Sequence, residues 1–307
     1  MSRHLAIVTP CYNEEKSIVS FLESLEKNLV ATDEQFSIIV VDDCSQDDTS
    51  NLISSFHFSS TLLTLHQLRL KFNMGHQTAI YQGLLFAHEI DADFVIVMDS
   101  DGEDDPRALP KIIQHQNFDV VEVRRGRRSE SLSFRFMYKV YKMIFYFITG
   151  KSMNYGNYCM INKGILERIT FTAFIHFPAY LLKQKGSKTY VRFDRGKRIQ
   201  GESKMGLQGL LIHSFKSFVE FGEDLLMLFL KIFVVIVFVI LVLFADILYQ
   251  KLIAHTAILG WTSTLLLGLF TIAILCIGFF VTGILLLNLI HQQNNKSQKD
   301  LYSIIKK

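Results

Sequence analysis

The segment Phe94-Val95-Ile96-Val97-Met98-Asp99-Ser100-Asp101 places two carboxylates directly after an apolar run with the character of a buried strand. Two carboxylates separated by one residue can hold one hard divalent cation, Mg²⁺ or Mn²⁺, whose other ligands come from water and substrate phosphates. Glu103 could add a third oxygen to Asp99 and Asp101. The same residues could instead form a solvated acidic turn, and this fragment alone leaves both interpretations open.

Other apolar runs around this segment predict an alternating architecture. Strands are expected at 5–8, 36–41, 62–68, 94–98 and 118–123, and helices at 14–29, 47–56, 77–89 and 106–114. Strands that are apolar throughout and alternate with helices indicate a parallel sheet with helices on both faces.

Polar residues cluster where three of these strands end, at 9–13, at Asp42-Asp43 and at 99–101. In such folds, ligands bind outside the carboxyl ends of the strands. Helix capping and turn formation would explain Asp42-Asp43 equally well in isolation. The sequence contains neither GxGxxG after the first strand nor GxxxxGK[ST], which disfavours Rossmann dinucleotide binding and P-loop hydrolysis. A nucleotide at the sheet edge, with its diphosphate bridged to the aspartates by a cation, is the remaining hypothesis.

The apolar residues are concentrated in the last third of the 307-residue chain, which is 50% hydrophobic overall. The stretch 225–249 is interrupted only by Lys231 and Asp246, and 257–290 contains no Asp, Glu, Lys or Arg. A bilayer core requires about 20 apolar helical residues, so both stretches are long enough to span it. Two buried core helices are the alternative, but the preceding 220 residues are too polar to enclose them. We therefore predict two transmembrane helices.

The distribution of lysines predicts the orientation of these helices. The connector 250–256 carries only Lys251, whereas four lysines follow His291. The positive-inside rule then places the domain 1–224 and the tail 291–307 on the cytoplasmic side, with no signal peptide expected. The four cysteines lack metal-binding spacing and are expected to be reduced. The net charge of +3 does not suggest a nucleic-acid partner.

Two further segments, 133–149 and 207–221, combine aromatic and aliphatic residues on one side with basic residues on another. This pattern predicts helices in the membrane interface, although an ordinary amphipathic helix on the domain core fits equally well. The basic cluster 124–128 is similarly compatible with anionic lipid headgroups or with phosphates of a substrate.

Several motifs resemble the family 2 glycosyltransferases of GT-A fold. They are Thr9-Pro10-Cys11-Tyr12-Asn13-Glu14-Glu15, Val41-Asp42-Asp43-Cys44-Ser45, Asn73-Met74-Gly75 and Met98-Asp99-Ser100-Asp101 followed by Pro106. Downstream, Asp119-Val120-Val121 leading into Arg124-Arg125, and Arg198-Ile199-Gln200-Gly201-Glu202-Ser203-Lys204, are similar to dolichyl-phosphate mannose synthase and the bacterial polyprenyl-phosphate glycosyltransferases. The resemblance covers residues 5–220. It implies an α/β GT-A (nucleotide-diphospho-sugar transferase) domain with interfacial helices and two C-terminal transmembrane helices.

The resemblance also implies roles for individual residues. Nucleotide-sugar contacts would come from Pro10, Tyr12, Glu14, Val41, Asp43, Asp99 and Ser100. Asp99, Asp101 and Glu103 would be the ligands of Mg²⁺ or Mn²⁺. Catalysis would involve Asp101 together with the phosphate-facing cations Arg125, Arg198 and Lys204. Preorganised cations at a leaving diphosphate stabilise the charge that develops in the transition state.

Two departures from the family pattern bear on the acceptor. Relatives commonly have Leu-Gln where this chain has Gly102-Glu103, which adds negative charge beside the cation. Asn154 and Asn157 lie where relatives often have aspartates, so no general base is evident there. A lipid phosphate is already ionised and needs no base, whereas a sugar hydroxyl does.

The first hypothesis is therefore a membrane-bound inverting glycosyltransferase that moves a sugar from a nucleotide donor to polyprenyl phosphate. The second is a non-processive transferase acting on a hydroxyl of a lipid-linked or cell-surface glycan, with its base elsewhere. A processive polysaccharide synthase is disfavoured, because the Q-x-x-R-W element is absent and the only tryptophan, Trp261, lies in the membrane segment. An inactive membrane scaffold and a homo-oligomer are left open.

Overall fold

A computed structural model of the chain describes residues 3–32, 34–125, 132–154, 156–194, 207–254, 260–294 and 302–306. These residues form two compact units, which are treated separately. The first comprises residues 1–142, 152–220 and 297–307, and the second comprises 143–151 and 221–296.

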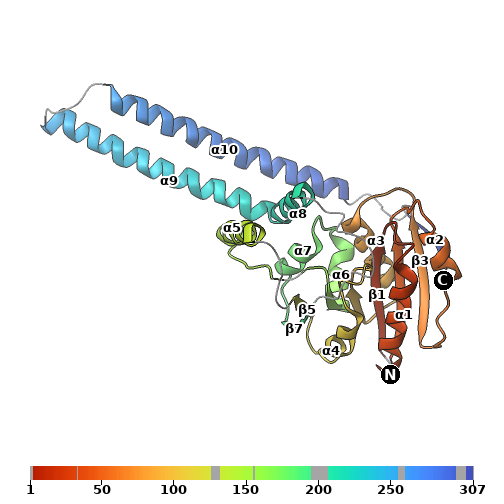
Figure 1. The fold of residues 1–307 in the computed structure, drawn as a ribbon. Coiled ribbons are helices and arrows are strands. Elements are labelled where there is room, and N and C mark those ends of the chain that lie inside the picture. Colours follow the sequence, from red (N-terminus) through yellow and green to blue (C-terminus); the bar gives the residue numbers. More distant parts are fainter. Residues whose placement is uncertain are drawn as a thin grey trace. The chain divides into compact units, whose positions relative to one another are not determined.

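The first unit is built on one sheet, whose eight described strands follow the order β7-β5-β6-β4-β1-β2-β3-β8 (Figure 1). The strands are β1 (His4–Cys11), β2 (Gln35–Asp42), β3 (Leu63–Leu70), β4 (Phe94–Val97), β5 (Val120–Arg125), β6 (Cys159–Asn162), β7 (Lys188–Phe193) and β8 (Tyr302–Lys306). β1 to β4 pair in parallel, and so do β5 and β7. The five predicted strands are all present, and their carboxyl ends share one edge of the sheet.

The sheet is mixed: the five predicted strands run parallel to one another, as expected, but two strands that were not predicted run antiparallel to their neighbours. β6 runs antiparallel to both β4 and β5, and β8 runs antiparallel to β3. β6 contains only four residues, Cys-Met-Ile-Asn, and the long helix α5 separates it from β5. Such a short run carries little periodicity, and its direction follows only from its pairing with β4 and β5 in the folded sheet.

Helices cover both faces of this sheet. The described helical elements of the first unit are α1 (Ile18–Leu29), η1 (Val30–Thr32), α2 (Thr49–Ser55), α3 (His76–Glu89), η2 (Pro106–Ala108), α4 (Leu109–Ile113), α6 (Lys163–Phe171), α7 (Phe177–Lys183) and α8 (Leu207–Glu220), together with most of α5 (Leu132–Thr149). Side chains of α1, α2 and α4 join one core cluster, and those of α3, α6 and α7 join the other. α3 lies close to β1, because a Cβ at Gly83 would stand 2.4 Å from a Val8 methyl carbon.

Two of the predicted helices, 14–29 and 106–114, differ from the structure for local reasons. α1 begins at Ile18 rather than at Glu14, since Asn13 adopts a left-handed conformation with φ of +53° and the next residues form a turn. The predicted helix 106–114 is split into η2 and α4. Pro110 follows directly after Leu109, the first residue of α4.

The last residues of the chain return to the sheet, whereas the sequence suggested only a tail after residue 290. β8 pairs with β3 at four positions, from Gln67 opposite Lys306 to Leu70 opposite Tyr302. The Tyr302 hydroxyl also donates to Glu89 of α3, at 3.4 Å. β8 therefore covers the edge of β3, which would otherwise expose unpaired backbone groups.

Removing residues 302–307 is expected to destabilise the sheet edge. Four cross-strand pairs contribute about 1–4 kcal/mol together, and their loss leaves the β3 amides open to solvent. Hydrogen exchange measured on the purified protein should show faster exchange in β3, while β1 in the sheet interior stays protected. Unchanged protection of β3 in the truncated protein would contradict the pairing.

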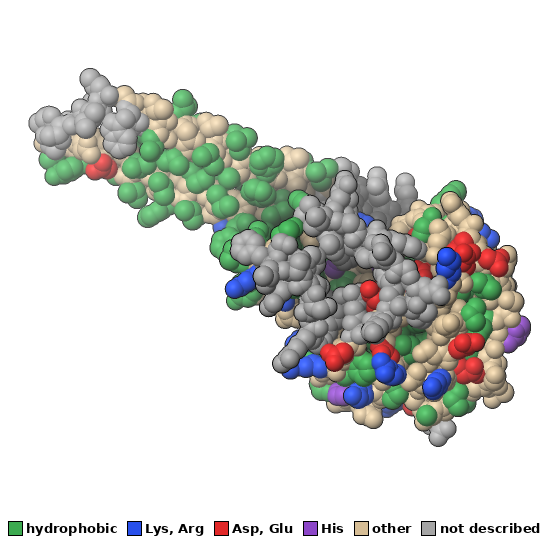
Figure 2. All heavy atoms as spheres, in the orientation of Figure 1, with side chains coloured by type: hydrophobic (Ala, Val, Ile, Leu, Met, Phe, Trp, Pro, Cys, Tyr) green, Lys and Arg blue, Asp and Glu red, His purple; other side chains and the backbone are tan. Residues whose placement is uncertain are grey.

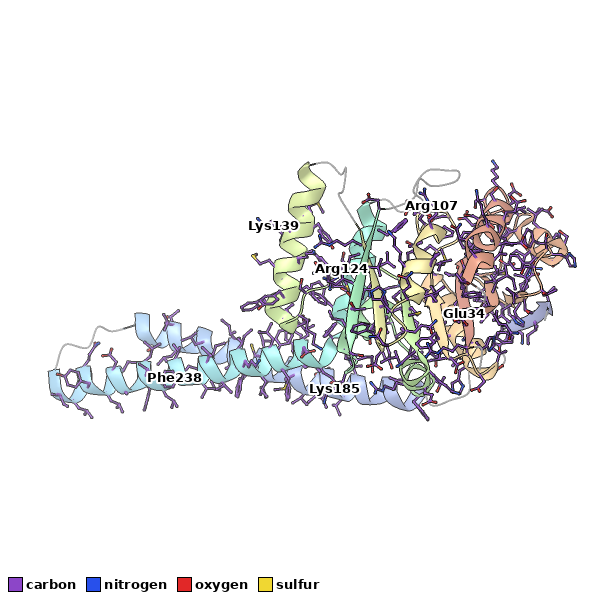
Figure 3. The ribbon with its side chains drawn as sticks, turned by 90° about the horizontal axis from the view of Figure 1, so that it is seen from below. Glu34, Arg107, Arg124, Lys139, Lys185 and Phe238 are labelled. Atoms are coloured by element: carbon purple, nitrogen blue, oxygen red, sulfur yellow. The ribbon has the colours of Figure 1, made fainter. Side chains whose placement is uncertain are left out.

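The second unit contains two long helices, α9 (Gly222–Tyr249) and α10 (Trp261–Asn294), and the single π-helical turn η3 (Gln250–Ala254). Gly222–Tyr249 and Ser263–Leu286 are long and apolar enough to cross a membrane, with mean hydropathies of 3.3 and 2.7. Hydrophobic side chains are spread along the visible surface of the two long helices (Figure 2), and Phe238, labelled in Figure 3, is 66% exposed. These exposed apolar surfaces suit a lipid environment.

The two helices pack as an antiparallel hairpin. Phe229 and Phe279 have ring centroids 5.7 Å apart, and a Cβ at Gly283 would stand 2.1 Å from a Leu226 methyl carbon. Gly283 therefore permits the close approach of α10 to α9, as small residues do between membrane helices. The observed bounds extend the predicted 225–249 by three residues at its start and shift the predicted 257–290 to 261–294.

Candidate active site

The loops after β1 and β2 are joined by hydrogen bonds at the carboxyl edge of the sheet. The backbone N–H of Asn13 donates to Ser45 Oγ at 2.9 Å, and that of Glu14 donates to Thr49 Oγ1 at 2.8 Å. The N–H of Gln46 donates to Asn13 Oδ1 at 2.8 Å. These bonds fix the positions of Tyr12 and Glu14, two of the residues expected to contact the nucleotide.

Asp42 and Asp43, which follow β2, have different surroundings. The buried Asp42 accepts the N–H of Ser45 at 2.8 Å and faces Arg69 Nε at 3.7 Å. Asp43 accepts the N–H groups of Met74 and Gly75, at 2.7 and 2.8 Å. Burial raises the pKa of Asp43, although these two hydrogen bonds oppose the shift. Asp42 thus stabilises the loop that follows β2, and Asp43 joins the loop before α3 to the end of β2.

The acidic segment after β4 folds back on itself. The N–H of Asp99 donates to Asp104 Oδ2 at 3.0 Å, and the N–H of Glu103 donates to Asp101 Oδ1 at 2.9 Å. The Ser100 hydroxyl donates to the carbonyl of Pro10 at 3.1 Å, which joins this segment to the end of β1. Gly102 has a φ of +85°, a conformation that suits glycine. The turn therefore presents its carboxylates at the same edge as Tyr12 and Asp43.

His76, the first residue of α3, lies against this acidic turn and was not singled out in the sequence. Its Nε2 lies 3.2 Å from Asp99 Oδ1, and Asn157 Nδ2 lies 2.9 Å from the same nitrogen. Burial acts to lower the pKa of His76, but the charges of Asp99, Asp104 and Asp101 raise it overall. The position of His76 directly after the Asn73-Met74-Gly75 turn could have marked it as a candidate site residue. Its contact with Asp99, however, depends on the tertiary fold.

The turn after β4 can supply two carboxylates to a cation. Among the described residues, no three His, Cys, Asp or Glu side chains are arranged to hold a metal ion by themselves. Mg²⁺ and Mn²⁺ are commonly bound by one or two carboxylates plus substrate phosphates and water. Asp99 and Asp101 fit that kind of shared site, and Glu103 lies in the same turn.

Val41 differs from the other residues expected to contact the nucleotide. Its side chain is fully buried in the core cluster beside Gly83, so only its backbone could meet a ligand. Tyr12 and Glu14 are partly exposed, while Pro10 is buried and offers its carbonyl to Ser100.

The predicted basic residues are described only in part. Arg124 lies 4.0 Å from the ring centroid of Tyr190 and 3.1 Å from Glu122 Oε2, so its side chain is held by β5 and β7 (Figure 3). Arg125 is the last residue of β5, opposite Phe193 in register, and its side chain lies outside the described part of the structure. Arg198 and Lys204 also lie outside the described residues.

A hollow opens beside the acidic turn, between the ends of β4, β5 and β7. Its lining residues are Glu103, Asp104, Asp105, Val123, Gly156, Tyr158, Phe193 and Asp194. Two of these lining residues are joined directly, because the Tyr158 hydroxyl donates to the Asp105 carbonyl at 3.0 Å. Asp194 was not identified in the sequence as a site residue, because nothing in its local pattern distinguishes it from a surface acid.

The sequence also matches a known protein family. The family model described as glycosyl transferase family 2 matches residues 6–180. Because this match spans more than half of the chain, the chain belongs to glycosyl transferase family 2. The resemblance inferred from the motifs is thereby confirmed.

Similar proteins include several undecaprenyl-phosphate sugar transferases. The undecaprenyl-phosphate 4-deoxy-4-formamido-L-arabinose transferase of Yersinia enterocolitica is 26% identical over 225 residues, which cover 68% of this chain and 64% of that protein. The uncharacterized glycosyltransferase YkcC of Bacillus subtilis is 25% identical over 293 residues, covering 88% and 84%. The chain matches only 47% of the Proteus mirabilis transferase of the same name and less than two thirds of the Yersinia protein.

Solved structures confirm the GT-A-like fold. Glucosyl-3-phosphoglycerate synthase from Mycobacterium tuberculosis, in complex with Mn²⁺, UDP-glucose and phosphoglyceric acid, has a TM-score of 0.52. It is 17% identical, and the match covers 73% of this chain and 80% of that one.

Proposed function

We propose that this protein is a membrane-bound inverting glycosyltransferase that transfers a sugar from a nucleotide-sugar to polyprenyl phosphate. The observation that carries the proposal is the convergence of the β1, β2 and β4 loops at one sheet edge. There the Ser100 hydroxyl reaches the Pro10 carbonyl, and Asp43 orders the loop before α3. The undecaprenyl-phosphate transferases among its relatives support the choice of acceptor.

The nucleotide is proposed to lie across the β1 and β2 loops. Tyr12 would stack on the base, the buried Pro10 would shape the end of β1 beneath it, and Asp43 would accept hydrogen bonds from the base or the ribose. Glu14, Ser100 and the backbone of Val41 would provide the remaining contacts with the nucleotide. The hydrogen-bonded loops favour binding because they are ordered before the ligand arrives.

The diphosphate is proposed to lie at the acidic turn. Asp99 and Asp101 would hold Mg²⁺ or Mn²⁺, with Glu103 as a further oxygen. When bound, such an ion neutralises the charge that develops on the leaving diphosphate. The structurally similar synthase binds Mn²⁺ together with UDP-glucose, which supports a divalent ion in this role. Arg125, Arg198 and Lys204 would place positive charge on the phosphates.

The acceptor phosphate is proposed to attack the sugar without a protein base. A phosphate monoester is ionised at neutral pH and is already a nucleophile. Asn157, where a base would be expected, makes hydrogen bonds with His76 and Gln77 instead. Attack on the face opposite the leaving diphosphate would invert the anomeric centre.

The catalytic unit is proposed to lie on the cytoplasmic side of an inner membrane, with α9 and α10 as a two-span hairpin. The chain leaves the first unit at Glu220, passes through both apolar helices and rejoins the same sheet as β8. One sheet cannot lie on both sides of a bilayer, so a spanning α9 requires a spanning α10. α5 and α8, joined by the 2.7 Å hydrogen bond between Tyr141 and Ser217, would lie in the interface.

Transfer of labelled sugar to lipid tests this proposal. Membranes containing the protein are incubated with a panel of radiolabelled nucleotide-sugars and undecaprenyl phosphate, followed by extraction into organic solvent. Label should enter the organic phase as a mild-acid-labile product with at least one donor. If no donor labels the lipid while a sugar acceptor is labelled, the proposed acceptor is wrong.

Transfer to a glycan hydroxyl is the second candidate, and the hollow beside the acidic turn is the observation that favours it. Glu103 and Asp194 both line this hollow, and either carboxylate could serve as a general base. This alternative would be selected by two results together. The unmodified protein would transfer sugar to a sugar acceptor but not to the lipid phosphate, and Asp194→Asn would lose the transfer to the sugar acceptor.

Lys204→Ala is expected to lower the turnover number roughly 10²-fold at saturating cation, because it removes a phosphate contact rather than a metal ligand. The matched control is Lys185→Ala, an exposed lysine before β7 at the opposite edge of the sheet (Figure 3). Steady-state rates at saturating donor and metal measure the effect. Equal rates for the two variants would remove Lys204 from the proposed phosphate-binding set.

A further inference from the structure

The segment from the last residue of α6 to the first residue of α7 displays apolar side chains on the protein surface. Its sequence is Phe171-Thr172-Ala173-Phe174-Ile175-His176-Phe177. Phe174 and Phe177 are buried, whereas Phe171 is 83% exposed and Ile175 is 39% exposed. Exposing a phenylalanine and an isoleucine to water is unfavourable, and clustered exposed apolar side chains commonly mark an interaction surface.

The buried aromatic residues hold this segment in place. The ring of Phe174 lies 5.5 Å from that of Tyr81, 5.1 Å from that of Phe177 and 5.9 Å from that of Tyr180. His176 Nδ1 accepts the N–H of Ala179 at 3.2 Å and caps α7. The packing of these buried side chains therefore holds Phe171 and Ile175 at the surface.

The same segment is fastened to the end of α8. Glu220 Oε2 accepts the N–H groups of Ile175 and His176, at 2.8 and 3.2 Å. Lys183 of α7 donates to the carbonyl of Glu220 at 3.0 Å. The position of Ile175 is thus tied to the last residue of α8.

Glu220 lies very close in the chain to the start of α9. Only Phe221 separates it from Gly222, so the two Cα atoms are at most about 7.6 Å apart. The apolar stretch, which only Lys231 and Asp246 interrupt, begins at Leu225, about 4.5 Å further along the helix. The headgroup region on each side of the hydrocarbon core is about 5–8 Å thick. If α9 spans, Glu220 lies at or near the headgroups, and so does the segment bound to it.

α8 contributes side chains of the same kind. Phe215 is 69% exposed and Val219 is 50% exposed, and their spacing of four residues places them on one face of the helix. Lys216, between them in sequence, is also exposed. Apolar side chains beside a lysine suit the boundary between lipid headgroups and acyl chains.

We propose that Phe171 and Ile175 form a wedge that inserts into the cytoplasmic leaflet of the bilayer, beside Phe215 and Val219. This inference rests on the membrane topology proposed above. The inserted side chains hold the face of the sheet covered by α6 and α7 at the lipid surface. This contact does not depend on α5.

Depth-dependent fluorescence quenching tests the wedge in the full-length protein. Trp261→Phe removes the native tryptophan, and Phe171→Trp or Ile175→Trp places a single reporter in the segment. The protein is reconstituted in phosphatidylcholine nanodiscs with or without lipids brominated near the top of the acyl chain. Val30→Trp is the matched control, because Val30 is 43% exposed and follows α1 on the other face of the sheet.

Both reporters in the segment should emit at shorter wavelength than the control and be quenched several-fold more strongly by brominated lipid. Quenching no stronger than that of Val30→Trp would overturn the proposal. A blue shift without quenching, which grows with the number of protein copies per disc, would assign the surface to a second copy of the chain and also overturn it.

Alkaline carbonate extraction separates a failed wedge from a failed topology. If the unmodified chain remains in the membrane pellet while the reporters are unquenched, only the wedge is wrong. If the unmodified chain is extracted into the supernatant, the spanning hairpin is wrong as well.

Discussion

Asp101→Asn is expected to lower the turnover number for sugar transfer by about 10²–10³-fold, the range for losing one electrostatic contact to a developing charge. Asn keeps an oxygen that can accept the N–H of Glu103, so the turn should retain its shape. The lost negative charge weakens the proposed cation site. The rate should recover in part at high Mn²⁺ concentration, which steady-state assays across a metal titration would measure.

Glu34→Gln provides the control for Asp101→Asn. Glu34 precedes β2, at the opposite edge of the sheet from the carboxyl ends, and is labelled in Figure 3. The same loss of charge at this position should leave the rate unchanged. Full activity in Asp101→Asn at low metal concentration would show that this carboxylate is not a ligand.

Asp43→Ala is expected both to destabilise the protein and to raise the KM for the donor. The change leaves the N–H groups of Met74 and Gly75 without their acceptor, at a cost of about 1–3 kcal/mol each where water cannot replace it. A lost hydrogen bond between a charged group and the nucleotide adds about 1.5–3 kcal/mol, or roughly 10- to 150-fold in donor affinity. Thermal unfolding and donor titration measure the two effects separately.

Asp43→Asn separates the structural part from the binding part. Its carbonyl oxygen can still accept one of the two N–H groups, so it should be more stable than Asp43→Ala. If Asp43 contacts only the loop before α3, donor affinity in both variants should follow the loss of stability. If Asp43 also binds the nucleotide, Asp43→Asn should lose affinity beyond its small loss of stability.

Most of the fold could be predicted because the central strands are continuous apolar runs. β1 and β2 are buried on both faces, and such runs are distinctive in a sequence. β8 could not be predicted in this way, since Tyr302–Lys306 is a short segment that follows the long apolar helix α10. Its strand conformation depends on pairing with β3, a partner more than 200 residues away in the chain.

The candidate site could be located from the sequence but not assembled in detail. The acidic residues were identifiable because they directly follow apolar strands. His76 pairs with Asp99, and Asp43 pairs with the loop before α3. These contacts join segments that are distant in the sequence and meet only at the edge of the folded sheet. Nothing in the local sequence indicates that Asp104 accepts the N–H of Asp99, because any acid in that turn has the same local pattern.

Anomalous X-ray scattering from Mn²⁺ tests the central claim most directly. Crystals of the full chain are grown with Mn²⁺ and the nucleotide-sugar selected by the labelling panel, and data are collected at the manganese absorption edge. An anomalous peak about 2.0–2.3 Å from a carboxylate oxygen of Asp101, and at the same distance from a diphosphate oxygen, is the predicted result. An ordered nucleotide at another edge of the sheet, with no manganese at the turn after β4, would contradict the account.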